Sequence, residues 1–143
     1  VYKRQGHDIT DEDTPIEAGL GFAIDWDKGE FLGRDALLAQ KDAPRSKRLI
    51  QFRIEDSDLL TYHDEPIYRD GVVVGSTSSS MWSATQNRCC AMGYVEHPDG
   101  ESITAAWLDE ATWEVNIGGQ MVPLSTSIRS LYDPQNQRPH LAV

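Results

Sequence analysis

The sequence predicts a mainly β protein in which an antiparallel β-barrel follows a short α/β segment. From Arg48 onward, short runs of alternating apolar residues recur at close spacing, as in an antiparallel barrel or sandwich. Two pairs between such runs, Asp70-Gly71 and Gly118-Gly119, are typical of two-residue hairpin turns. A length of 143 residues, 39% of them hydrophobic, suffices for one domain with its own core. We place the barrel at residues 46–143 and assign residues 1–45 to a separate unit.

The region before the barrel begins with an acidic turn and continues as a strand and a helix. Gly6–Glu17 is rich in carboxylates, and Leu20–Ile24 alternates apolar and small residues, which predicts a short strand. Gly33–Lys41 has high helix propensity, and Pro44 ends the helix. Nothing earlier in the sequence supplies a partner for the strand, so we expect this region to be a truncated piece of a longer polypeptide.

The barrel region contains seven expected strands, each a short run with apolar alternation. They are Leu49–Ile54, Glu65–Tyr68, Val72–Gly75, Cys89–Val95, Ser102–Leu108, Thr112–Ile117 and Met121–Ile128. The tail from Tyr132 to Val143 carries two prolines and few apolar residues, which predicts an irregular, extended segment.

The charge balance argues against two classes of partner. With 13 Lys and Arg against 23 Asp and Glu, the formal net charge is 13 − 23 = −10. Nucleic acid and anionic membrane surfaces both attract clustered positive charge, so neither is expected as a partner. No apolar run approaches the roughly 20 residues that span a bilayer. The adjacent Cys89 and Cys90 predict two reduced thiols, one inward and one outward on a strand, in a reducing compartment.

The residues by themselves do not identify a reaction. The four histidines lack metal-ligand spacing; they are His7, His63, His97 and His140. His7-Asp8 beside Asp11 resembles a carboxylate–histidine cluster, but we favour an exposed acidic turn there. Ser76–Ser80 lacks the strand–turn–helix setting of a nucleophile elbow, so loop or strand-edge hydroxyls are expected.

Several short motifs follow one another in a specific order along nearly the whole chain. They are Gly6–Ile9, Thr14–Phe22, Phe31–Leu37, Glu65–Ile67, Gly71–Gly75, Thr77-Ser78 and Ala91–Val95. In this order they resemble the second half of a glycine-cleavage T-protein (aminomethyltransferase). Val1–Lys3 and Ser130–Pro134 also resemble the folate-binding C-terminal region of the FAD-dependent dimethylglycine and sarcosine dehydrogenases.

The resemblance implies a three-part arrangement around tetrahydrofolate, to which a one-carbon unit passes from an aminomethyl donor. The family's catalytic Asp and a folate-binding Glu fall before Val1. The resemblance therefore implies that residues 1–45 are the end of the middle folate-binding domain and that residues 46–143 are the C-terminal barrel. No catalytic residue is expected within this chain, which by itself should be inactive.

Four residues are candidates for cofactor binding through the resemblance. Tyr2 matches a position beside the folate-binding Glu, and Lys47 and Arg48 match a basic position near the anionic glutamate tail. Trp82 follows the Thr-Ser motif and is a candidate wall of the pocket. The alternatives are a solvated charge pair at Lys47 and Arg48, and ordinary packing of Trp82. Gln5 replaces a common aromatic, which leaves a different methyl donor open.

We therefore expect the C-terminal portion of a tetrahydrofolate-dependent one-carbon (aminomethyl) transferase, with FAD only where an upstream dehydrogenase domain precedes it. The alternatives are a non-catalytic barrel module that shapes a domain or subunit interface, and a folate-dependent demethylase of another methyl donor. The expected partners are folate, a small methylated amine and upstream domains of the same chain. Val1–Ala43 is expected to be disordered or held by a second copy through self-association. The expected compartment is the cytoplasm, or the mitochondrial matrix in a eukaryote.

Overall fold

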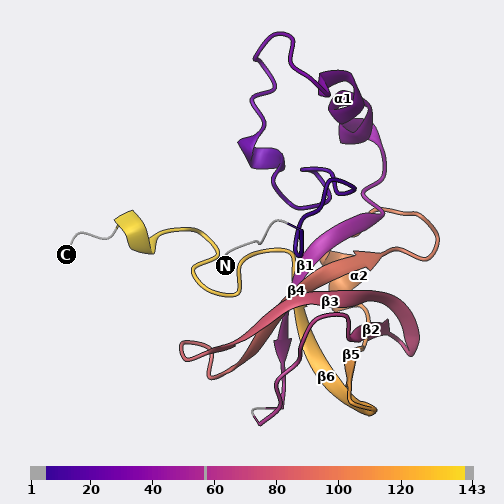
Figure 1. Ribbon diagram of the computed structural model, residues 1–143, viewed down its shortest axis with the longest axis vertical. Coiled ribbons are helices and arrows are strands. Elements are labelled where there is room, and N and C mark those ends of the chain that lie inside the picture. The colour runs from indigo at the N-terminus through magenta and orange to yellow at the C-terminus, as the bar shows by residue number, and fades with distance from the viewer. Residues whose placement is uncertain (1–5, 57, 141–143) are drawn as a thin grey trace.

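The main body of the computed structural model, which describes residues 6–56 and 58–140, is a closed barrel (Figure 1). Its strands run antiparallel in the spatial order β1-β4-β3-β2-β5-β6. They are β1 (Lys47–Ile54), β2 (Pro66–Arg69), β3 (Val72–Ser83), β4 (Arg88–Glu96), β5 (Trp113–Ile117) and β6 (Gln120–Ser127). The barrel closes because β1 pairs with β4 on one side and β6 on the other. The predicted mainly β class and the antiparallel barrel are confirmed.

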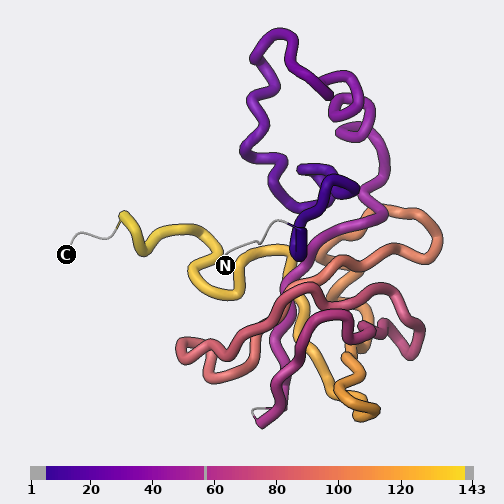
Figure 2. The backbone as a smooth tube through the Cα atoms, in the orientation of Figure 1, coloured from indigo at the N-terminus to yellow at the C-terminus, as the bar shows by residue number. Residues whose placement is uncertain are grey.

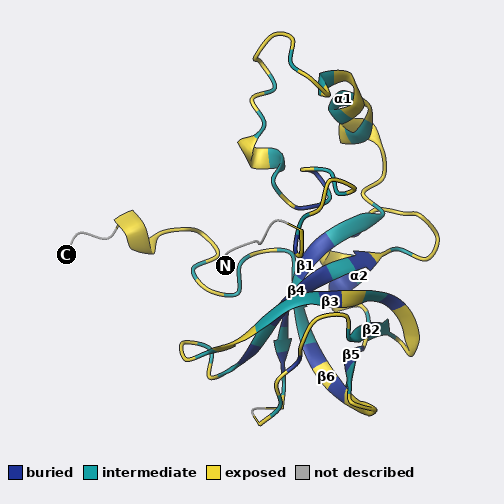
Figure 3. Cartoon of the chain, viewed as in Figure 1, coloured by how far each residue is buried: buried dark blue, intermediate teal, exposed yellow. Residues whose placement is uncertain are grey.

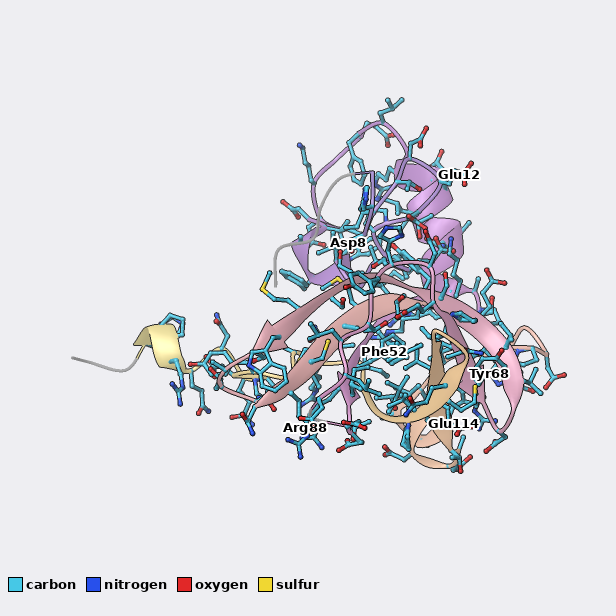
Figure 4. The ribbon with its side chains drawn as sticks, turned by 60° about the horizontal axis from the view of Figure 1, so that its bottom comes forward. Asp8, Glu12, Phe52, Tyr68, Arg88 and Glu114 are labelled. Atoms are coloured by element: carbon cyan, nitrogen blue, oxygen red, sulfur yellow. The ribbon has the colours of Figure 1, made fainter. Side chains whose placement is uncertain are left out.

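The barrel interior is filled by alternating apolar side chains. Ile50, Phe52 and Ile54 of β1 are fully buried, and Figure 4 shows Phe52 among the side chains of the interior. Helix α2 (Ala105–Asp109) adds Leu108 to the same core, where the Trp113 indole N–H donates to the Leu108 carbonyl at 2.8 Å. Cys89 is buried and Cys90 is half-buried, and both thiols are free, as the alternation along β4 predicts.

Both predicted hairpin turns are confirmed by their backbone angles. Asp70 and Gly71 have φ values of 49° and 79°, and Gly118 and Gly119 have values of 59° and 94°. Two successive positive φ values match the right-handed twist of the strands that they join. These turns fix the registers of β2 against β3 and of β5 against β6.

Two predicted strands are wrong. Ser102–Leu108 contains helix α2, because Thr104 caps it by accepting a hydrogen bond from the Trp107 amide at 3.1 Å, and two alanines with high helix propensity follow. Leu20–Ile24 contains the 3-10 turn η1 (Gly21–Ala23), and Phe22 is 86% exposed. The closed barrel leaves no strand edge to which Leu20–Ile24 could pair.

Residues 20–46, which we call the arm, loop away from the barrel (Figure 2). The arm contains the predicted helix, α1 (Arg34–Asp42), which begins after Gly33 at a φ of 86°. None of the residues of the arm is buried (Figure 3). In contrast, residues 6–19 lie against the barrel, because the Leu49 amide donates to the Glu17 carbonyl at 2.9 Å and Ala18 is 1% exposed. The expectation that Val1–Ala43 is disordered or held by a second copy is therefore wrong for residues 6–19, which the barrel of the same chain holds.

The tail beyond β6 is irregular, as predicted, apart from the single 3-10 turn η2 (Arg138–His140) among its described residues. It leaves the barrel on the side opposite the β5–β6 turn in Figure 1. Two glutamines hold Leu131 against the barrel: the Gln86 amide nitrogen donates to the Leu131 carbonyl at 2.9 Å, and the Gln51 amide oxygen accepts from the Leu131 amide at 3.2 Å.

Candidate functional site

A pocket of about 770 Å³ lies where the arm, β1 and the end of β6 meet, and we call it the basic pocket. Four cationic side chains line it: Lys41, Arg45, Arg48 and Arg129. Among the described residues of its lining, Asp109 is the one acidic residue. The chain has 13 Lys and Arg and a net charge of −10, so this local excess of positive charge stands out against the whole protein. Such a concentration of cations favours an anionic ligand.

Arg48 is the most constrained of these cations. It is half-buried, and its Nη1 donates to the Ile103 carbonyl at 3.4 Å. Its Nε is buried without a hydrogen-bond partner among the described residues. Burial, and next the charge of Arg45, lower the pKa of Arg48 from its usual value. An unsatisfied donor and a like-charged neighbour both cost free energy that an anion in the pocket would relieve.

Lys47 lies on the other face of β1 from Arg48, because successive strand residues point to opposite sides. Its Nζ is 2.8 Å from Oδ1 of Asp13 and 4.8 Å from the centre of the Tyr94 ring. Lys47 therefore fastens the N-terminal segment to the barrel, and the structure separates it from the basic pocket that Arg48 lines.

The junction between residues 6–19 and the barrel is a second polar centre. Asp8 is fully buried, and its Oδ1 accepts a hydrogen bond of 2.7 Å from the Ser78 hydroxyl. The predicted exposed acidic turn is therefore wrong at Asp8. Burial, and then the carboxylates of Asp13, Glu17 and Asp8, raise the pKa of the Tyr94 phenol well above its usual value. This junction holds the two segments together, and Lys47, the cation that the described residues contribute to it, is paired with Asp13.

Trp82 lines a different hollow of about 440 Å³, which we call the hairpin pocket. Its lining comes from the β3–β4 hairpin, β1 and the tail. The residues are Gln51, Ser79, Ser80, Met81, Trp82, Ser83, Gln86, Cys90, Ala91, Met92, Leu131 and Tyr132. Trp82 is 41% exposed, so it forms a wall and is not part of the barrel core. Arg48 and Trp82 thus line two separate pockets, while Tyr2 lies outside the described residues.

Sequence reasoning missed three of the four cations of the basic pocket. Lys41, Arg45 and Arg129 come from the end of α1, the linker to β1 and the segment after β6. No motif joins them, since only barrel closure brings residue 129 beside residue 48. The pairing of β1 with β6 is the feature that places them together.

A known family matches the barrel. The glycine cleavage T-protein C-terminal barrel domain matches residues 47–133, which is more than half of the chain. The chain belongs to this family. Its structure is also similar to the crystal structure of the glycine cleavage system aminomethyltransferase T from Bartonella henselae, with a TM-score of 0.69 and 24% identity. That match covers 90% of this chain and 34% of the other, and it supports the fold.

Three curated relatives of this family member carry different names. A 4-methylaminobutanoate oxidase (formaldehyde-forming) from Paenarthrobacter nicotinovorans is 35% identical over 96% of this chain and 16% of its own length. The mitochondrial pyruvate dehydrogenase phosphatase regulatory subunit of Mus musculus is 36% identical over 80% and 14%. An aminomethyltransferase from Halothermothrix orenii is 34% identical over 86% and 34%. The chain thus spans about a third or less of the length of each relative. Among the described residues, no helix is long and apolar enough to cross a membrane.

Proposed function

We propose that this chain forms one wall of a tetrahydrofolate site in a larger one-carbon (aminomethyl) transferase, and that the basic pocket holds the anionic glutamate tail of the folate. The observation that carries the proposal is the buried, unpartnered Nε of Arg48 in a pocket with three further cations. Guanidinium groups bind carboxylates through paired hydrogen bonds, which is the contact that the tail requires. The residues present therefore fit this end of the cofactor.

In this proposal the folate supplies the nitrogen atoms that accept the one-carbon unit. The chain's own residues bind and orient the tail. Arg48 is held rigidly by the barrel and by the Ile103 carbonyl, so its position is fixed before the ligand arrives. Lys41 and Arg45 belong to the arm, so tail binding would also order the arm against the barrel. The catalytic carboxylate lies outside this chain in the proposal, so the chain alone should not transfer the one-carbon unit.

The wider reaction follows from the names of the relatives. The relative named as a formaldehyde-forming oxidase acts on a methylated amine. We propose that the donor for the larger protein is a small methylated amine, and that an upstream flavin (FAD) domain oxidises it. In this proposal the flavin is held by that upstream domain.

A second candidate is a non-catalytic module that shapes a domain or subunit interface. The observation that favours it is the relative named as a phosphatase regulatory subunit, which is 36% identical to this chain. The two candidates differ in folate binding. At 100 times its dissociation constant, a ligand that binds only the folded state adds about 2.7 kcal/mol of stability. Tetrahydrofolate should raise the thermal stability of the full-length protein under the first proposal and leave it unchanged under the second.

The tail site is tested with p-aminobenzoyl-triglutamate, which carries the tail without the pterin. Calorimetric titration of the chain should show binding that weakens with added salt. Arg48→Gln should lower the affinity about tenfold or more, since hydrogen bonds to charged groups contribute about 1.5–3 kcal/mol. Arg53→Gln is the matched control on the same strand, because Arg53 pairs with Glu55 and does not line the pocket. Equal affinities for both variants would refute the assignment of the tail to this pocket.

A further inference from the structure

Two histidines from distant parts of the sequence lie side by side where residues 6–19 meet the barrel. The centres of the His7 and His63 rings are 6.3 Å apart, and the ring planes stand at 78° to each other. Both residues line a hollow of about 400 Å³, which we call the histidine pocket. The His63 side chain is 64% exposed, so small solutes can reach it. The spacing of the histidines along the sequence does not reveal this pair.

The residues that follow the two histidines are both held by the bulge of β3. Asp8 is fully buried, and its carboxylate accepts a hydrogen bond of 2.7 Å from the Ser78 hydroxyl (Figure 4). The backbone amide of Asp64 donates to the Thr77 carbonyl at 2.6 Å. Thr77 and Ser78 are consecutive, so one short stretch of β3 fixes the backbone beside each histidine. The fold therefore holds the two rings near each other before any ligand arrives.

Asp64 also orients the ring of His63. Its Oδ2 lies 2.7 Å from Nδ1 of His63, so in the neutral ring Nδ1 carries the proton and donates it. Nε2 then keeps the lone pair that can bind a metal ion. A carboxylate on one ring nitrogen is the usual support of a metal-binding histidine, because it fixes the tautomer and makes the other nitrogen more basic.

The separation of the rings suits one metal ion between them. A zinc ion binds an imidazole nitrogen at about 2.0–2.1 Å, which places two ring centres on the same ion about 4.5–6.4 Å apart. The observed 6.3 Å lies within this range. Among the described residues, no group of three or more His, Cys, Asp or Glu side chains is placed to hold a metal ion. Water would therefore occupy the other positions around an ion held by two histidines.

We propose that His7 and His63 bind one divalent transition-metal ion of the Zn²⁺ class, and that Asp64 is the positioning residue for His63. Imidazole ligands favour such ions over Mg²⁺ and Ca²⁺, which take oxygen ligands. The net charge of −10 favours the approach of a cation. The bound ion would join residues 6–19 to the barrel, across the junction that Asp8 and Ser78 already hold. The site shares no lining residue with the basic pocket and does not depend on folate.

Titration of the chain with zinc chloride, followed by calorimetry and by NMR of the histidine rings, tests the site. One Zn²⁺ should bind per chain. The ring resonances of His7 and His63 should shift, and those of His97 and His140 should stay where they are. Zn²⁺ should also raise the temperature of thermal unfolding, because the ion links two segments only in the folded state. Magnesium chloride should shift neither pair of rings.

Variants separate the imidazoles from the surrounding carboxylates. Asp64→Asn should weaken Zn²⁺ binding at least about tenfold, which is the lower limit for loss of a carboxylate behind a metal-binding histidine. Asn tolerates the positive φ of 62° at this position. His7→Ala and His63→Ala should each weaken binding further. The matched controls are His140→Ala in the tail and Asp11→Asn, which removes a carboxylate of the same segment that does not line the pocket.

The proposal fails if Zn²⁺ does not bind, or if Mg²⁺ shifts the same rings. It also fails if Zn²⁺ binding persists in the double variant of His7→Ala and His63→Ala, since the ion would then sit on other groups. Equal effects of Asp64→Asn and Asp11→Asn would show that Asp64 contributes only its charge and does not position His63.

Discussion

The hydroxyl of Ser78 donates a 2.7 Å hydrogen bond to the carboxylate of Asp8, across 70 residues of sequence. Ser78 reaches Asp8 because β3 contains a bulge between Thr77 and Ser79, which leaves Ser78 outside the regular pairing with β4. The same hydroxyl lies 3.3 Å from the Met92 carbonyl. Asp8 is fully buried, so its carboxylate has no contact with water. The bulge places the Ser78 hydroxyl where it donates a hydrogen bond to that buried carboxylate. One irregularity in the barrel thus docks the N-terminal segment.

Removing this donor should destabilise the junction. Ser78→Ala should lower the free energy of unfolding by about 1–3 kcal/mol, because a buried carboxylate loses a hydrogen bond. Ser76→Ala is the matched control, since Ser76 lies on the same strand and its hydroxyl makes no hydrogen bond to another described residue. Urea unfolding of the two variants measures the difference. Equal unfolding free energies would show that the bond to Asp8 contributes nothing.

The Lys47–Asp13 pair should add to the free energy of unfolding over a broad range of pH and lose this effect at low and at high pH. Burial alone raises the pKa of Asp13, but hydrogen bonds from Lys47 and Thr10 outweigh it and hold that pKa below its usual value. Its contribution is therefore present above about pH 4 and lost as the pH falls through the lowered pKa. Burial alone lowers the pKa of Lys47, but Asp13 outweighs it and raises that pKa above its usual value, so its contribution is present at neutral pH and is lost only as the pH rises through the raised pKa.

Lys47→Met should flatten this profile. It removes the ammonium but retains much of the apolar stem that covers the barrel. The difference in unfolding free energy between the natural chain and the variant should be largest near pH 7 and shrink below pH 4 and above pH 11. Denaturant titrations at pH 3, 7 and 11 measure it. A difference that stays constant across these values would mean that the ion pair does not supply the stability.

Close approach of β3 and β4 makes Gly93 intolerant of substitution. A Cβ on Gly93 would collide with the Ser76 carbonyl oxygen, which is backbone and cannot rotate away. Gly93→Ala should therefore cost about 3 kcal/mol, at the upper end of the range for overpacking. Gly29→Ala is the control, because Gly29 lies in the arm with open space around it and without a positive φ. If thermal unfolding shows equal stability for the two variants, the strands are farther apart than described.

Local patterns predicted most of the barrel and failed where the structure depends on distant segments. Alternation and the two glycine turns located the six strands, since each signal lies within a few residues. They did not give the full length of β3, which continues to Ser83 beyond the expected Val72–Gly75 because its serine-rich half has no apolar alternation. The helix at Ala105–Asp109 was missed because a five-residue helix buries only Leu108 and shows no periodicity. The strand expected at Leu20–Ile24 requires a partner, and the closed barrel offers none.

The candidate sites were less predictable than the fold. Lys47 and Arg48 are adjacent in sequence, but strand alternation sends them to different sites, and this follows only once β1 is known to begin at Lys47. Arg129 joins Arg48 through barrel closure, which no local pattern encodes. Asp8 looked like part of a solvated acidic run, because its burial depends on Ser78. Sites built from several segments are therefore visible only after the topology is known.

The arm should exchange its backbone amide hydrogens much faster than the barrel. None of its residues is buried, and Phe22 and Leu32 are 86% and 102% exposed. Few buried contacts imply that local opening costs little free energy, whereas barrel amides exchange only through larger openings. Hydrogen exchange of the 143-residue chain should show amides of residues 20–32 exchanging first. In the full-length protein the same amides should be protected if upstream domains cover these side chains, as we propose. If the arm amides of the monomeric chain are protected as strongly as the amides of β1 and β4, the conclusion that the arm has no core of its own is wrong.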